Sequence, residues 1–390
     1  MSSRLLFEDK VRTRLEPMRQ GEGAYKFVDE SAWESCAAYR TLLNGWLSNY
    51  PESEQREMIA RLSRGSDDAF YAALAELIVR EALRKCCSAI IHHPHVPATK
   101  NKPDFKLETR DGNTLAFVEV TSYGIDGTKL GKGAQASTIF NAINDMRLPA
   151  GYVLGYQLVR EGTSSPPLKP LVKRVRAWVD AKRSEAWREP PEELFTAGDW
   201  EVSLTLHRLS SGTVADRAIG VYSADARFIG PSSDLRRALE VKSSRYGELG
   251  APYLIAVADR KGEMTWGEGI HDTVVSALFG DVCYRWQAGE ADGTWVRNTN
   301  GFFGHDRRPR RAHVSAVLVL PQPDIWGLRN PNHQPILVRN PWASYSLPGE
   351  ILPIQETTYS PVAGFARVDG KPLGDLLGLP EVWPPRSDAR

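Results

Sequence analysis

Residues 102–124 read KPDFKLETRDGNTLAFVEVTSYG. Two strand-like runs, KPDFKLE and LAFVEVTS, are separated by Asp111-Gly112-Asn113, a typical turn signal between antiparallel strands. Asp104 stands at the start of the first predicted strand, and Glu119 lies inside the second. Because a short turn pairs such strands side by side, we expect these two carboxylates to lie close enough to share one ion.

Glu119 lies within a predicted strand that is otherwise largely apolar. Side chains alternate between the two faces of a strand, so Phe117, Glu119 and Thr121 share one face. A carboxylate in an apolar strand is costly to bury unless it is paired, protonated or bound to a cation. Two converging carboxylates suit a hard divalent cation such as Mg²⁺. Two alternatives stay open: Glu119 forms an ion pair with a cation such as Arg110, and Asp104 caps local N–H groups.

Helical and strand patterns interleave on both sides of this segment. Residues 66–87, SDDAFYAALAELIVREALRKCC, predict a helix that begins at a Ser/Asp cap and carries Glu76. Glu76 either supports the acidic pair or faces water beside Arg80, four residues further on. We predict an α/β (α+β) fold with a central mixed β-sheet flanked by helices.

The same patterns divide the chain into four predicted parts. They are an N-terminal helical segment (1–65), a core (66–160), a C-terminal α/β extension that packs on or extends the core sheet (161–367), and a loosely packed Pro/Gly-rich tail (368–390).

The core resembles the PD-(D/E)XK, or restriction-endonuclease-like, nuclease superfamily. Pro103-Asp104 matches the PD element, Glu119-Val120-Thr121 occupies the place of (D/E)-X-K, and Glu76 matches a glutamate that many members carry on the first core helix. The resemblance implies that Asp104 and Glu119 ligate Mg²⁺ or Mn²⁺ and that Glu76 supports the ion directly or through water. It also implies that the ion activates a water molecule for phosphodiester hydrolysis. More loosely, the later segment KSSRYGELGAPYLIAVAD resembles bacterial proteins with this kind of core.

The chain departs from the family pattern at Thr121, which stands in the lysine position. A short neutral side chain cannot supply the positive charge of that lysine. We favour Lys132, in the Gly/Lys-rich segment GIDGTKLGKG, as its replacement, and Lys106 on the first predicted strand next. Lys129 and Lys242 are further candidates, the latter on a later predicted helix at a distance that the sequence does not define.

Several segments outside the core are candidates for contact with nucleic acid. Residues 305–313, HDRRPRRAH, hold four arginines that suit sequence-independent phosphate contacts: Arg307, Arg308, Arg310 and Arg311. A solvated loop is the alternative interpretation. The basic predicted helix at about 168–185 is a candidate groove contact, and Trp295, Trp326 and Trp342 are candidate base-stacking residues. Their ordinary alternatives are a surface helix and core packing.

Composition excludes several classes of protein. The chain has 49 Lys+Arg against 48 Asp+Glu, a net charge of +1, so no overall field draws it onto nucleic acid or membrane. No apolar run reaches the roughly 18–20 residues of a membrane helix, and the N-terminus lacks a signal-peptide pattern. The four cysteines lack CxxC spacing, which is typical of the reducing cytoplasm.

These observations predict a cytoplasmic, bacterial, Mg²⁺- or Mn²⁺-dependent endonuclease that hydrolyses DNA phosphodiester bonds. A homodimer is one expected state, since nucleases that cut both strands often pair. The alternative prediction is a non-catalytic nucleic-acid-binding or protein-interaction module that retains the nuclease fold.

Overall fold

The computed structural model describes residues 5–19, 21–64, 66–97, 99–123, 130–209, 217–222, 231–260, 270–285, 294–321, 324–349 and 351–385. The chain forms two compact units. We call Met1–Glu16, Ala24–Ile125 and Ile229–Arg390 the core unit, and Pro17–Gly23 with Asp126–Phe228 the inserted unit. Each unit is described by itself.

The core unit contains helices from both ends of the chain. Its helical elements are α1 (Ala24–Glu30), α2 (Glu34–Ser48), α3 (Glu52–Arg64), α4 (Asp67–Arg84), α7 (Pro231–Ser243), α8 (Ile270–Phe279), α9 (Leu373–Leu376) and the 3-10 turns η2 (Ile325–Gly327) and η3 (Pro331–His333). Helix α4 begins where the sequence predicts, because the Ser66 hydroxyl accepts a hydrogen bond from the N–H of Ala69.

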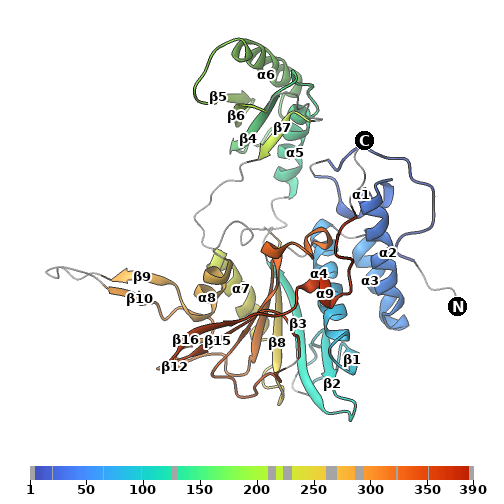
Figure 1. Ribbon diagram of the computed structural model, residues 1–390, viewed down its shortest axis with the longest axis vertical. Coiled ribbons are helices and arrows are strands. Elements are labelled where there is room, and N and C mark those ends of the chain that lie inside the picture. The colour runs from blue at the N-terminus through green and yellow to red at the C-terminus, as the bar shows by residue number, and fades with distance from the viewer. Residues whose placement is uncertain are drawn as a thin grey trace. The chain divides into compact units, whose positions relative to one another are not determined.

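An eight-stranded mixed sheet forms the centre of the core unit (Figure 1). Its order is β1 (Ala89–His92), β2 (Phe105–Glu108), β3 (Thr114–Tyr123), β8 (Tyr253–Asp259), β13 (Ala316–Pro321), β14 (Ile336–Arg339), β15 (Glu356–Ser360) and β16 (Gly364–Val368). Strands β1, β2 and β3 pair antiparallel, whereas β3, β8 and β13 run parallel. Two small ribbons, β9 (Val282–Arg285) with β10 (Thr294–Arg297) and β11 (Gly304–His305) with β12 (Arg308–Pro309), lie outside this sheet. The predicted α/β class, with a large mixed sheet flanked by helices, is confirmed.

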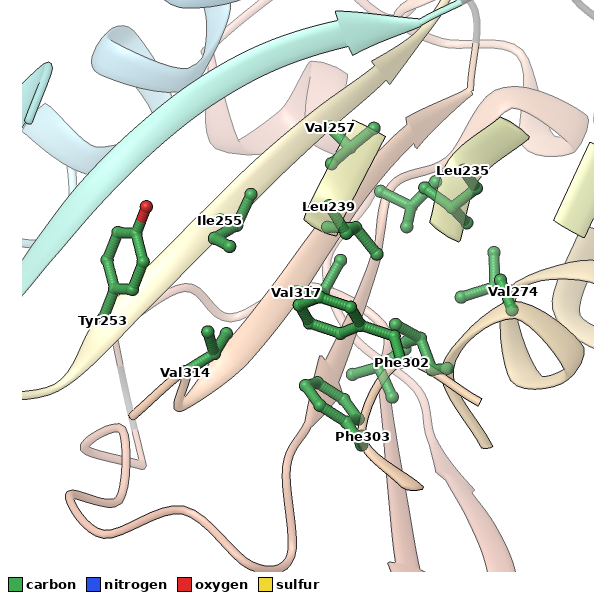
Figure 2. Packing of buried hydrophobic residues seen from close by; sticks show 14 of the residues in the cluster. Leu235, Leu239, Tyr253, Ile255, Val257, Val274, Phe302, Phe303, Val314 and Val317 are labelled. Carbon is green, nitrogen blue, oxygen red and sulfur yellow. The ribbon is translucent and has the colours of Figure 1, made fainter. Parts of the chain in front are cut away.

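Helix α7 packs against β3 and β8, while α4 also packs against β3. Figure 2 shows Leu235 and Leu239 of α7 beside Ile255 and Val257 of β8, all within one buried cluster. Parallel neighbours such as β3 and β8 need a crossover connection, and α7 belongs to it. This crossover carries the end of α7 to the face of β3 on which Phe117 is buried.

The inserted unit is a separate α/β layer. It contains α5 (Leu130–Asn144), β4 (Tyr152–Arg160), α6 (Leu168–Arg183), β5 (Glu192–Ala197), β6 (Trp200–Arg208) and β7 (Ile219–Tyr222). Its strands form a sheet in the order β5-β6-β4-β7, and side chains of α5 and α6 share one buried cluster with it. The predicted core of 66–160 therefore differs from the observed division, because β4 pairs with β6 and β7 rather than with β3.

The last part of the chain also differs from the prediction. Leu373, Leu377 and Leu379 are buried, so residues 373–379 pack more closely than the loose tail that the Pro and Gly content of this region indicates. At the other end, α1, α2 and α3 agree with the predicted helical segment. None of the helices in the described ranges has the length and apolar character needed to cross a bilayer.

Candidate functional site

Asp104 immediately precedes β2, at the point where that strand meets β3. Phe105 pairs with Val118, and continuing this antiparallel register by one position places Asp104 beside Glu119. The half-buried Asp104 carboxylate accepts a hydrogen bond through Oδ2 from the backbone N–H of Val120 at 2.6 Å. The alternative in which Asp104 caps an N–H group is thus present, although the donor lies on the neighbouring strand.

Glu119 lies in the middle of β3 and is 1% exposed. Its Oε1 accepts from Lys242 Nζ at 2.5 Å and from Arg245 Nη1 at 2.9 Å, while Oε2 accepts from the hydroxyl of Tyr246. All three donors come from the end of α7 and the turn that follows it. The predicted partner Arg110 is exposed instead. The ion-pair alternative for Glu119 is therefore found, but with cations from a distant segment.

Glu76 is buried on α4, because α3 packs against that helix. Its Oε1 accepts from the hydroxyl of Tyr50 at 3.1 Å, and Oε2 pairs with Arg61 Nη1 at 2.7 Å. The alternative in which Glu76 faces water beside Arg80 is wrong. Arg80 instead pairs with its neighbour Glu81.

The charges of Glu119 and Glu76 act on Asp104. Burial, and then the negative charges of Glu119 and Glu76, raise the pKa of Asp104 to about 7, while Lys242 opposes the shift. Burial lowers the pKa of Arg61, but Glu76 and Asp104 outweigh that effect and raise it overall. A carboxyl group with a raised pKa beside other acids and fixed cations is a common feature of functional sites.

Among the lysines whose side chains the structure describes, Lys242 is the one that contacts Glu119. Thr121 follows Glu119 by two residues, lies on the same face of β3 and is half-buried. Lys106 forms an ion pair at 2.7 Å with a glutamate of its own strand. Lys132 belongs to α5, but its side chain, like all of Lys129, lies outside the described residues. Sequence reasoning gave Lys242 too little weight. The available signal was its spacing to Arg245 and Tyr246, which places all three on one side of a helix end.

The donor atoms at this site have the right chemistry for a hard cation, since both acids present only oxygen. Asp104 Oδ1 accepts no hydrogen bond from a described residue. A shared ion would have to take the place of Lys242 or Arg245 on Glu119. Within the described ranges, no three His, Cys, Asp or Glu side chains are grouped so that they could hold a metal ion together. Asp104 and Glu119 therefore present two carboxylates at this site, and Glu76 acts on Asp104 through charge.

The predicted phosphate-contact arginines lie on the β11–β12 hairpin and just beyond it. All are exposed, and none forms an ion pair with a described residue: Arg307, Arg308, Arg310 and Arg311. The turn of the hairpin is anchored by a hydrogen bond from the Tyr359 hydroxyl to Asp306 Oδ2 at 2.8 Å. The hairpin and the residues just after it therefore present exposed guanidinium groups, of which that of Arg311 lies 6.0 Å from the centroid of the Phe302 ring.

The three tryptophans considered for base stacking have different environments. Trp342 packs beside Phe279 and Tyr359, which makes it a packing residue. The side chain of Trp295 lies outside the described residues. Trp326 packs against Tyr39 with the two rings tilted by 35°, and it lines a pocket in the core unit.

Comparisons of the chain with protein-family models, curated proteins and solved structures found no match.

Proposed function

We propose that the core unit is a metal-dependent nuclease that hydrolyses DNA phosphodiester bonds, with Asp104, Glu119 and Lys242 as its central residues. The observation that carries the proposal is the 2.5 Å contact between Lys242 Nζ and Glu119 Oε1, beside the half-buried carboxylate of Asp104. Asp104 and Glu119 stand in the positions of the two motif acids, and a lysine from helix α7 contacts Glu119 in place of the motif lysine. In this proposal Lys242 supplies the charge that Thr121 lacks.

Each residue has a distinct role in the proposed reaction. Asp104 and Glu119 hold a Mg²⁺ or Mn²⁺ ion, which when bound lowers the pKa of water and neutralises charge on the phosphate. Lys242, released from Glu119, orients the attacking water and stabilises negative charge on the phosphate oxygens. Arg61 holds Glu76 in place, so that Glu76 adds negative potential without facing the substrate.

A cleavage assay on supercoiled plasmid DNA, with Mg²⁺ or Mn²⁺ added, tests the proposal. We expect Asp104→Asn, Glu119→Gln and Lys242→Met each to reduce nicking by roughly 100-fold or more, because each removes a charge from the reacting centre. Lys106→Met is the matched control, since it removes a lysine from the neighbouring strand that pairs elsewhere. Equal cleavage by the Lys242→Met variant and the parent would contradict the assigned role of that residue.

A second candidate is a non-catalytic nucleic-acid-binding module. It is favoured by one observation: both oxygens of Glu119 and both oxygens of Glu76 already accept hydrogen bonds from protein groups. A metal titration separates the two functions. DNA binding without cleavage, unaffected by Mg²⁺ or Mn²⁺ and by Asp104→Asn, supports the binding module.

A further inference from the structure

A pocket of about 650 Å³ lies in the core unit, between the start of α2, η2 and the C-terminal segment. Three half-buried indole rings line it: Trp33, Trp326 and Trp383. Its volume falls within the range of roughly 300–1,000 Å³ that small-molecule sites occupy. The proposed nuclease chemistry makes no use of it.

Trp33, Trp326 and Arg329 are held in place by contacts with residues outside the pocket lining. The indole N–H of Trp33 donates to a backbone carbonyl of the N-terminal segment at 2.9 Å. Trp326 packs on the buried ring of Tyr39, with ring centroids 4.9 Å apart. Arg329 Nη1 pairs with Asp375 at 2.5 Å. A preformed aromatic pocket of this kind loses little conformational entropy when a flat ligand enters.

The polar part of the lining restricts the charge of the ligand. Arg329 and Glu381 both line the pocket, together with Asn330. The Arg329 guanidinium is already paired with Asp375 and also donates to the Leu379 carbonyl, so a phosphate or other anion would meet the Glu381 carboxylate instead. A neutral ring with hydrogen-bond donors and acceptors along its edge complements the Glu381 carboxylate and the Asn330 amide. Indole faces stack well on nucleobase rings, whichever base is present.

We propose that this pocket binds an unpaired nucleobase. The base stacks on an indole face within the pocket while its edge contacts Asn330 and Glu381. This inference goes beyond the proposed hydrolysis and does not depend on it, because the pocket contains none of the acidic-site residues.

Calorimetric titration of the full chain with adenosine and with uridine, in EDTA, tests the pocket without any cleavage. We expect saturable binding with a Kd of about 1 mM or tighter. Trp383→Leu should weaken binding by about tenfold or more, because one stacking surface is lost. Trp383→Phe should recover most of the affinity. Trp187→Leu, which removes an indole from the inserted unit, is the matched control and should change nothing.

Three outcomes would overturn the proposal. The first is no saturable binding of either nucleoside by the folded parent chain. The second is unchanged affinity in the Trp383→Leu variant. The third is binding of tetramethylammonium or of a proline-rich peptide with no binding of nucleosides, which would identify an aromatic cage or a peptide groove. Circular dichroism of both Trp383 variants verifies that loss of binding is not loss of fold, and Trp383→Phe keeps the test valid if Trp383→Leu misfolds.

Discussion

The environment of Asp104 opposes ionisation of its carboxyl group, which lowers the stability of the folded protein at neutral pH. Its carboxyl group is held beside two other acids, and burial together with those charges raises its pKa to about 7. In an unfolded chain an aspartate ionises near pH 3.9. Between these values the folded state binds more protons than the unfolded state, so stability falls as pH rises from about 4 to about 7. Such a cost is typical of a site shaped for binding or catalysis.

We therefore expect Asp104→Asn to stabilise the protein at pH 8 while leaving its stability near pH 4.5 almost unchanged. The neutral amide avoids the repulsion, and the expected gain at pH 8 is about 1–2 kcal/mol, less than the full pKa shift implies because the group is only half-buried. Urea unfolding in EDTA at pH 4.5 and at pH 8 measures the change in the free energy of unfolding. Asp111→Asn, at the exposed turn between β2 and β3, is the control. A parent-like pH profile in the Asp104→Asn variant would contradict the argument.

The β11–β12 hairpin is the element with the clearest electrostatic consequence. Its arginines are exposed and carry no ion pair with a described residue, so their charge is available to a polyanion. Phosphate contacts release counterions from DNA, and each contact adds about 0.9 to the slope of log affinity against log salt. The contribution of the hairpin is therefore measurable even if it does not read sequence.

Replacing the four hairpin arginines by glutamine should weaken binding of duplex DNA and lower the salt slope by about 2–4. Fluorescence anisotropy at several salt concentrations measures both quantities. The matched comparison removes four exposed cations from α6 of the inserted unit: Lys169, Lys173, Arg176 and Arg183. If the α6 variant loses affinity and the hairpin variant does not, the phosphate contacts belong to the inserted unit.

At the scale of the whole molecule, the inserted unit interrupts the core unit between β3 and α7. Each unit has its own buried cluster, and within the described residues each sheet is built from strands of one unit. The residues of the proposed site all belong to the core unit, although Glu119 and Lys242 are 123 positions apart. The contacts that the structure describes at the acidic site therefore come from the core unit.

Replacing 126–228 by a flexible Gly/Ser linker should leave the core unit folded. We expect one cooperative thermal transition and an unchanged effect of Asp104→Asn on stability at pH 8, because the sheet, α4 and α7 are all retained. Differential scanning calorimetry measures the thermal transition and the effect of Asp104→Asn on it at pH 8. The isolated segment 126–228 is the complementary sample and should unfold cooperatively by itself. A core chain without a cooperative transition would mean that the two units fold only together.

Local sequence patterns were sufficient to predict much of this protein. Period-2 alternation and the Asp-Gly-Asn turn predicted β2 and β3 and the proximity of Asp104 to Glu119, because both signals act over a few residues. The Ser66 cap predicted the start of α4 for the same reason. The α/β class followed from the order of such elements along the chain.

The partners of these elements depend on contacts between distant segments, which no local pattern encodes. An apolar alternating run such as β4 looks the same whether it joins the central sheet or a separate one, so its assignment to the core unit was wrong. Likewise, the spacing of Lys242 to Arg245 and Tyr246 groups three donors at a helix end, but it does not indicate that their acceptor is a buried carboxylate 123 residues earlier. The packing of α7 across β3 and β8 brings the Lys242 ammonium group to Glu119. The buried Glu119 carboxylate needs such a cation, because an unpaired charge in the interior is costly.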